Sequence, residues 1–252
     1  MPLPGVTIDE DRIVSSTGAL DLKQVPKHLL VVGAGYIGLE MGTVWRRLGA
    51  KVTVVEFLDR ITPGMDGEVA KEFQKLLTKQ GMTIMTGAGV EKLSATAKGV
   101  SASIKAKDGK VVTSEFSHAI VAIGIVPNTE TIGLEKLGVK TTKGHIDTDG
   151  MCRTNVPGIW AIGDVTAPPW LAHKASHEGV IAVEAIAGGH PHAMDPLNIP
   201  GCTYCHPQIA SVGLTEAKAK EAGHKVKVGK FPFIGNGKRS EERRVGKECL
   251  RL

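Results

Sequence analysis

Short apolar runs alternate with amphipathic stretches in the first half of the chain. An apolar run at 28–32 precedes several glycines, and a second one lies at 51–56. Short apolar runs between turn signals are typical of buried strands. Between these runs, apolar residues stand at the spacing of one helix face: Ile37, Met41, Val44, Trp45 and Leu48. Gly49 follows, where the end of a helix favours glycine. The pattern predicts strand, helix and strand, as in a parallel sheet.

A second helix is expected after Asp66, whose side chain can cap a helix start. Its apolar face would consist of Val69, Phe73, Leu76 and Leu77. Gly81 ends this helix, and residues 83–86 read as a short strand. This helix and strand continue the alternation of the preceding unit.

An antiparallel hairpin and one more buried strand follow. Residues 100–105 alternate apolar and polar positions, Asp108-Gly109 is a turn signal, and residues 110–115 return. Residues 118–123 form a buried strand that ends at Gly124. Because parallel sheets bind ligands beyond the carboxyl ends of their strands, Gly124 is expected near a ligand.

The pattern changes after Gly150. Residues 154–164 read as a turn, a strand and a Gly-Asp pair, and a helix is expected at roughly 171–187. A proline-punctuated linker leads to residues 202–235, where we expect a strand, a helix at 215–222 and another strand.

Composition excludes several classes of protein. The chain has 252 residues, of which 42% are hydrophobic and 23% charged, as in an ordinary globular protein. A net charge of +5 and an aromatic content of 4% argue against nucleic-acid binding. No apolar run reaches the roughly 20 residues that span a bilayer, and the N-terminus does not resemble a signal peptide. Four cysteines without a disulfide-framework pattern favour a cytoplasmic or similarly reducing compartment.

The run Gly33-Ala34-Gly35-Tyr36-Ile37-Gly38 has the spacing of a dinucleotide-binding turn between a strand and a helix. The first glycine permits a tight turn, and the second lets the backbone approach a pyrophosphate. The third lets the helix pack close to the strand, and free N–H groups at the helix start face the phosphates.

Glu56 ends the second strand, where a carboxylate can accept hydrogen bonds from both hydroxyls of the adenosine ribose. A 2′-phosphate there would meet a negative charge, and no arginine pair replaces Glu56, although Arg60 lies nearby. The sequence therefore favours NAD over NADP. The alternative is that Glu56 simply ends a strand in solvent.

Three further stretches carry a family resemblance, at 154–164, 170–179 and 205–213. With residues 33–40 they resemble, in order and spacing, the dihydrolipoyl dehydrogenases of the pyridine nucleotide–disulfide oxidoreductase family. The resemblance covers about residues 1–238. It implies an α/β fold with a Rossmann-like, doubly wound NAD-binding domain and a β-hairpin insertion, plus partial FAD-binding and partial α+β dimerisation domains.

The resemblance divides the chain into five expected parts. They are a remnant of an FAD-binding domain (1–27), the NAD-binding domain (28–147), a second FAD segment (148–197), the start of a dimerisation domain (198–238) and a non-native tail (239–252).

The same resemblance assigns site residues. Val90, Ala122 and Gly124 would contact NAD through their backbones, and Tyr36 would lie over the nicotinamide pocket, unless its ring simply packs. Glu40 matches a glutamate that pairs with an active-site lysine near the nicotinamide; that lysine is absent here, so an ordinary helix glutamate is the alternative.

On the flavin side, the resemblance implies that Asp164 binds the ribityl chain of FAD and that the backbone around Ala172 approaches the flavin ring. The Asp164 carboxylate is expected to be buried. The alternative for Asp164 is that it caps the following helix.

The implied reaction is the oxidation of dihydrolipoyl groups, with electrons passing through a disulfide and FAD to NAD. Expected partners are a second copy in a homodimer and the lipoyl domain of a 2-oxoacid dehydrogenase complex. The family's glycine-rich FAD start, its Cys-x4-Cys disulfide and its catalytic His-Glu pair are not found, so we expect an internal fragment without a complete catalytic set. Alternatives are an NADH oxidase or ferredoxin reductase type without a disulfide, or a non-catalytic NAD-binding module.

Two short motifs suggest other chemistry. Cys202-Thr-Tyr-Cys205-His206 fits a haem-attachment or redox pattern, but unpaired cysteines are the expected state. His173 and His177 stand at i and i+4, which suits a metal, but no third ligand has suitable spacing and no metal is expected.

Overall fold

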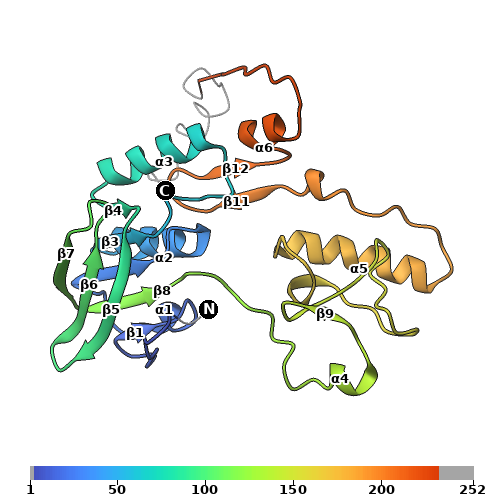
Figure 1. Ribbon diagram of the computed structural model, residues 1–252, viewed down its shortest axis with the longest axis horizontal. Coiled ribbons are helices and arrows are strands. Elements are labelled where there is room, and N and C mark those ends of the chain that lie inside the picture. Colours follow the sequence, from blue (N-terminus) through green and yellow to red (C-terminus); the bar gives the residue numbers. More distant parts are fainter. Residues whose placement is uncertain (1–2, 233–252) are drawn as a thin grey trace, which may run out of the picture. The chain divides into compact units, whose positions relative to one another are not determined.

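The computed structural model describes residues 3–232 (Figure 1). The described residues divide after Gly213 into two units that follow one another along the chain. The tail expected at 239–252, with Cys249, lies outside the described residues.

A five-stranded sheet forms the centre of the first unit. From edge to edge it runs β1 (Ile13–Val14), β8 (His118–Val121), β2 (His28–Val32), β3 (Lys51–Glu56) and β4 (Thr83–Thr86), all parallel. The strands predicted at 28–32, 51–56 and 83–86 are confirmed residue by residue, whereas the one predicted at 118–123 ends at Val121.

The edge strand β1 comes from the segment 1–27 that we expected to be a remnant of an FAD-binding domain. It pairs with β8, and Ala119 N–H donates to the carbonyl oxygen of Arg12 over 2.8 Å. The short helix α1 (Gly18–Asp21) follows it. At least this part of the segment therefore extends the five-stranded sheet.

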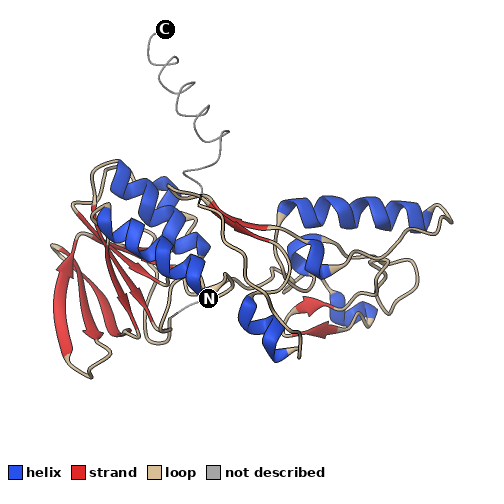
Figure 2. Ribbon diagram, turned by 90° about the horizontal axis from the view of Figure 1, so that it is seen from above, coloured by secondary structure: helices blue, strands red, loops and turns tan. Residues whose placement is uncertain are grey.

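Different layers cover the two faces of the sheet (Figure 2). Helices α2 (Tyr36–Arg47) and α3 (Gly67–Lys79) pack on one face, against side chains such as Val31 and Val54. The other face, with Leu30 and Val32, is covered by an antiparallel sheet of β5 (Gly89–Thr96), β6 (Gly99–Lys105) and β7 (Val111–Phe116). The predicted hairpin corresponds to β6 and β7. Strand β5 was not predicted, because most of its side chains are not buried and apolar periodicity is weak there.

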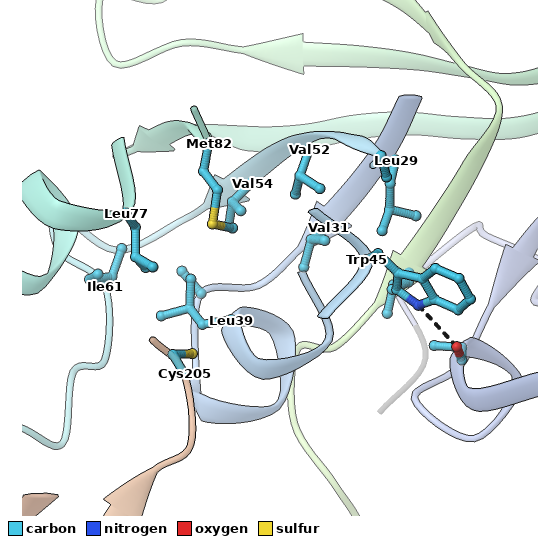
Figure 3. Packing of buried hydrophobic residues seen from close by; sticks show 14 of the residues in the cluster. Leu29, Val31, Leu39, Trp45, Val52, Val54, Ile61, Leu77, Met82 and Cys205 are labelled. Carbon is cyan, nitrogen blue, oxygen red and sulfur yellow. Dashed lines mark hydrogen bonds between the residues drawn. The ribbon is translucent and has the colours of Figure 1, made fainter. Parts of the chain in front are cut away.

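The buried face of α2 differs from the predicted one. Leu39 is completely buried, whereas Val44 and Leu48 are exposed. Gly38 and Gly42 account for the shift: a Cβ at Gly42 would stand 3.2 Å from Met82, so the glycine side of the helix lies against the sheet. Figure 3 shows Leu39 and Trp45 among the strand side chains, with the indole N–H of Trp45 donating to the Ala19 carbonyl (3.1 Å).

The start of α3 agrees with the sequence, since the Asp66 carboxylate accepts the N–H of Glu68 over 3.0 Å. Its buried face again differs in part, because Ala70 is buried and the predicted Val69 is exposed. Phe73 and Leu77 fill the core as predicted.

We expect Asp66→Ala to lower the free energy of unfolding by about 1 kcal/mol, because the helix loses the acceptor at its start. Asp66→Asn keeps an oxygen in that place and serves as the matched control, with a change of a few tenths of a kcal/mol at most. Urea denaturation of the two variants measures the difference. Equal stability of both would contradict the capping role.

The remainder of the first unit has its own small core of Leu134, Val139, Ile146 and Ala161. Its elements are α4 (Leu134–Leu137), β9 (Thr141–Thr142), β10 (His145–Ile146), η1 (Gly163–Val165), α5 (Ala172–Ile186) and η2 (Pro196–Asn198). The strand predicted within 154–164 is reduced to one bridge, between Arg153 and Trp160. A strand persists only where neighbours hydrogen-bond to it, and in the described part of the chain this is the only ladder contact of that segment.

A hairpin of β11 (Gly201–Thr203) and β12 (Ile209–Ser211) ends the first unit. Cys205, just after β11, lies in the core around α2, and Gln80 Nε2 donates to the carbonyl oxygen of His206 (2.6 Å). In the second unit, α6 (Glu216–Glu221) is capped by Thr215, close to the predicted helix. The strand predicted after that helix is not present in residues 223–232.

Candidate functional site

The glycine turn lies between β2 and α2. Gly33 has a φ of +105°, and a Cβ there would overlap the carbonyl oxygen of Ala122. A Cβ on Gly38 would overlap the carbonyl oxygen of Gly33. In contrast, a Cβ on Gly35 would meet no atom within 4 Å. Two glycines are therefore required by the fold itself, and the middle one adjoins open space at the start of the helix.

Glu56 is fixed against this turn. The residue is 8% exposed; Oε2 accepts the N–H of Ala34 (2.6 Å) and Oε1 accepts the N–H of Leu58 (2.8 Å). The alternative that Glu56 ends its strand in solvent is therefore wrong. Each carboxylate oxygen has a second lone pair, so both can still accept a hydrogen bond from a ligand hydroxyl.

A cleft of about 980 Å³ opens at the carboxyl ends of β2 and β3. Most residues predicted to contact NAD line it: Gly33, Gly35, Tyr36, Ile37, Glu56, Val90, Ala122 and Gly124. Ala34 and Gly38 complete the turn without lining the cleft. Its volume suits a cofactor, and a backbone without Cβ beside a polar carboxylate fits a pyrophosphate joined to a ribose.

Sequence reasoning missed two aromatic residues of the cleft, Phe57 and Trp170. Phe57 follows Glu56 and is 81% exposed, so most of this large apolar residue faces solvent. The indole N–H of Trp170 donates to the Thr166 carbonyl (3.1 Å), and its ring stacks on His145 with centroids 5.1 Å apart. The sequence did offer a signal for Phe57, because an aromatic residue directly follows the strand that ends at Glu56.

Tyr36 and Glu40 occupy the start of α2. Burial raises the pKa of the Tyr36 hydroxyl, and the negative charges of Asp164 and Glu40 raise it further. The Glu40 carboxylate accepts the N–H of Tyr204 (2.7 Å), so this helix glutamate has a backbone partner.

The flavin-side residues lie near the start of α5. Asp164 is in the short helix η1, and its side chain is exposed, so the expectation of a buried carboxylate is wrong. Leu171 is the N-cap residue of α5, which excludes Asp164 as its cap. Ala172 begins α5. An exposed carboxylate on a short turn, with a small residue at the next helix start, fits a polyol chain that approaches the backbone.

Within the described residues, no group of three His, Cys, Asp or Glu side chains could hold a metal ion. His173 Nε2 is bonded to the Pro200 carbonyl oxygen (2.9 Å), so one ring nitrogen of the histidine pair is already occupied.

The thiols of Cys152, Cys202 and Cys205 are free. Burial raises the pKa of the Cys205 thiol from its usual 9.0 to about 11. The thiolate is the reactive form, so Cys205 is inert near neutral pH.

We therefore expect alkylation of Cys205 in the folded chain to keep accelerating, about tenfold per pH unit, beyond pH 9. In the urea-unfolded chain the rate should level off near pH 9, because the thiol regains its usual pKa. Iodoacetamide labelling followed by peptide mass spectrometry measures both profiles. Identical profiles in the two states would show that burial does not control this thiol.

Comparison with known proteins agrees with this geometry. The family model for pyridine nucleotide-disulphide oxidoreductases matches residues 1–179, and the model for the dimerisation domain of that family matches residues 199–249. The chain therefore belongs to the pyridine nucleotide-disulphide oxidoreductase family, and this membership implies FAD and NAD as cofactors. The second match extends into the segment that we expected to be a non-native tail.

Curated relatives show which members of the family the chain resembles. The chain is 52% identical over 94% of its length to a dihydrolipoyl dehydrogenase of Zymomonas mobilis. It is 50% identical, over the same share, to the mitochondrial dihydrolipoyl dehydrogenase 1 of Arabidopsis thaliana. The alignments cover 51% and 47% of those relatives, so the chain spans about half their length.

Solved structures share the fold. LpdA from Mycobacterium tuberculosis superposes with a TM-score of 0.85 at 29% identity, covering 96% of this chain and 52% of that one. The HOCl-induced flavoprotein disulfide reductase RclA from Escherichia coli gives a TM-score of 0.83 at 27% identity, covering 94% and 55%. Among the described helices, none has the length and apolar character needed to cross a membrane.

Proposed function

We propose that this chain supplies the NAD-binding part of a dihydrolipoyl dehydrogenase. The observation that carries the proposal is the contact of Glu56 with the Ala34 N–H (2.6 Å), because it joins the ribose-binding carboxylate to the phosphate-binding turn. The neighbours at about 50% identity support the same activity.

In this proposal each residue has a defined task. The turn at Gly35 and the N–H groups at the start of α2 bind the pyrophosphate of NAD, and Glu56 binds the adenosine ribose. Asp164 accepts hydrogen bonds from the ribityl hydroxyls of FAD. FAD, when bound, supplies the redox centre between a substrate-reduced disulfide and NAD. The protein contributes orientation, since a nicotinamide held in place reacts as part of one complex.

Oxidation of dihydrolipoamide needs a redox disulfide, and no two cysteines of this sequence have the Cys-x4-Cys spacing. We therefore infer that the chain binds NAD and does not by itself turn over lipoamide. The matched dimerisation domain supports a homodimer. A lipoyl domain as partner and a cytoplasmic location complete the proposal; the free thiols of the described cysteines agree with a reducing compartment.

Titration of the purified chain with NADH, followed by the fluorescence of the nicotinamide, tests the proposal. We expect saturable binding of NADH, weaker binding of NADPH and no dihydrolipoamide-dependent formation of NADH from NAD. A folded chain that binds no NADH would contradict the cofactor site. Lipoamide turnover would contradict the inference that the chain lacks the redox disulfide needed for catalysis.

A further inference from the structure

A buried ion pair links α5 to the short helix that carries Asp164. Lys174 Nζ lies 2.7 Å from Glu178 Oε1, and the two side chains are only 8% and 14% exposed. Both residues stand one helical turn apart on α5, where charged pairs usually lie in solvent. The comparable pair in α6, Lys220 and Glu216, is 62% and 37% exposed.

Each member of the pair has a second bond outside its helix. Glu178 Oε2 accepts the N–H of Gly163 (2.8 Å), and Lys174 Nζ donates to the hydroxyl of Thr166 (3.1 Å). That hydroxyl in turn donates to the carbonyl oxygen of Gly163 (2.7 Å). The four groups close a ring of hydrogen bonds in which both backbone polar groups of Gly163 take part.

Gly163 is the residue directly before Asp164, and its φ of +75° is one that residues with side chains rarely adopt. A Cβ at this position would also stand 3.4 Å from Ala175 on α5. Thr166, at the other end of η1, is 2% exposed. The ring therefore fixes both ends of the turn from which the Asp164 side chain projects, although Asp164 itself is exposed.

Stability alone is a weak reason for such a pair. Desolvation offsets much of the attraction between buried charges, and apolar residues of similar size are often equally stable in their place. What apolar residues cannot supply is a pair of hydrogen bonds to one particular turn. The cost of burial and the closed ring together favour a role in positioning.

We propose that Glu178, with Lys174 as its buried counter-charge, is a positioning residue for flavin binding, which holds the Gly163–Val165 turn so that Asp164 meets the ribityl chain. This inference rests on the flavin site of the proposed function. Neither residue contacts the cofactor in this proposal; both act through Asp164.

Two double variants of the full chain distinguish the loss of the hydrogen bond to the turn from the loss of the two charges. Lys174→Met/Glu178→Gln removes both charges and keeps an amide oxygen to accept the Gly163 N–H. Lys174→Met/Glu178→Leu also removes both charges, with side chains of similar size, but leaves that N–H without its acceptor. The first variant is therefore the matched control for the second.

The first measurement is hydrogen–deuterium exchange of the Gly163 amide by NMR, which needs no cofactor. We expect exchange at least about tenfold faster in the leucine variant than in the glutamine variant, as for the loss of one hydrogen bond. The second is the affinity for FAD, measured by quenching of flavin fluorescence. Here we expect about tenfold weaker binding in the leucine variant and at most a small change in the glutamine variant.

Asp164→Asn shows whether the effect passes through Asp164. If it does, adding Asp164→Asn to the leucine variant weakens FAD binding by less than the product of the separate effects, because coupled residues are not additive. Full additivity, or equal Gly163 exchange and equal FAD affinity in the two double variants, would overturn the proposal. If the leucine variant does not fold, Thr166→Val replaces it in the FAD titration, because it removes the hydroxyl bond to the Gly163 carbonyl oxygen and so loosens the same turn.

Failure of the proposed flavin site would give a different result. A wild-type chain that binds no FAD contradicts the flavin site and, with it, the flavin role of the pair. The exchange rate of Gly163 then still decides whether Lys174 and Glu178 fix the turn.

Discussion

Gly35→Val is expected to weaken NADH binding about 10- to 100-fold, while the unfolding temperature falls by a few degrees at most because valine is a poorer N-cap of α2 than glycine. A Cβ at this position meets no protein atom within 4 Å, so the fold has room for a side chain. The same space is where the backbone has to approach the pyrophosphate, and forcing extra methyl groups into a packed contact costs about 1–3 kcal/mol. Isothermal titration calorimetry with NADH, beside thermal unfolding of the free chain, measures both quantities.

Gly38→Ala provides the contrasting control on the same helix. Its Cβ would overlap the backbone oxygen of Gly33, so this variant should lose stability before any question of cofactor arises. If Gly35→Val bound NADH like the wild type, the cleft beside the turn would not be the pyrophosphate site. If it instead lost as much stability as Gly38→Ala, Gly35 would be a structural glycine like the other two.

The separation of roles among these glycines illustrates what the sequence can and cannot predict. The spacing indicated the turn, and the buried strands β2, β3 and β4 were predicted residue by residue because apolar runs between turn signals leave few alternatives. The helix face was predicted less well, since a glycine contributes no hydrophobic signal and yet marks the side of α2 that packs closest to the sheet.

Long-range pairing was the second limit. Strand β1 gave a weak signal, and its partner β8 lies far along the chain, so the local sequence gave no indication of that pairing. Lys174 and Glu178 stand at i and i+4, a spacing at which charged pairs usually lie in solvent, and only the three-dimensional structure reveals that they are buried against the Gly163 turn. The exposure of Asp164 was mispredicted for the same reason: the strand expected before it is reduced to one bridge.

Glu56→Gln is expected to reduce the preference for NADH over NADPH at least tenfold. The carboxylate accepts two backbone N–H groups, from Ala34 and Leu58, one at each oxygen. An amide group offers only one acceptor oxygen, so its NH₂ would face a backbone N–H and the side chain would have to turn. NADH then loses charge-assisted bonds to its ribose, each worth about 1.5–3 kcal/mol, whereas the 2′-phosphate of NADPH no longer meets a negative charge.

Glu91→Gln is the matched control, because Glu91 lines the same cleft and the change removes the same charge. Glu91 Oε1 lies 3.7 Å from Lys105 Nζ, and Glu91 is not part of the glycine turn. Loss of its charge should therefore change the affinities for NADH and NADPH alike and leave their ratio within about twofold. Parallel titrations of the two variants with NADH and NADPH give the ratios. A ratio that falls equally in both would assign the selectivity to the general charge of the cleft. A ratio unchanged in Glu56→Gln would remove Glu56 from the ribose site, and its contact with the Ala34 N–H would then serve only to hold the turn.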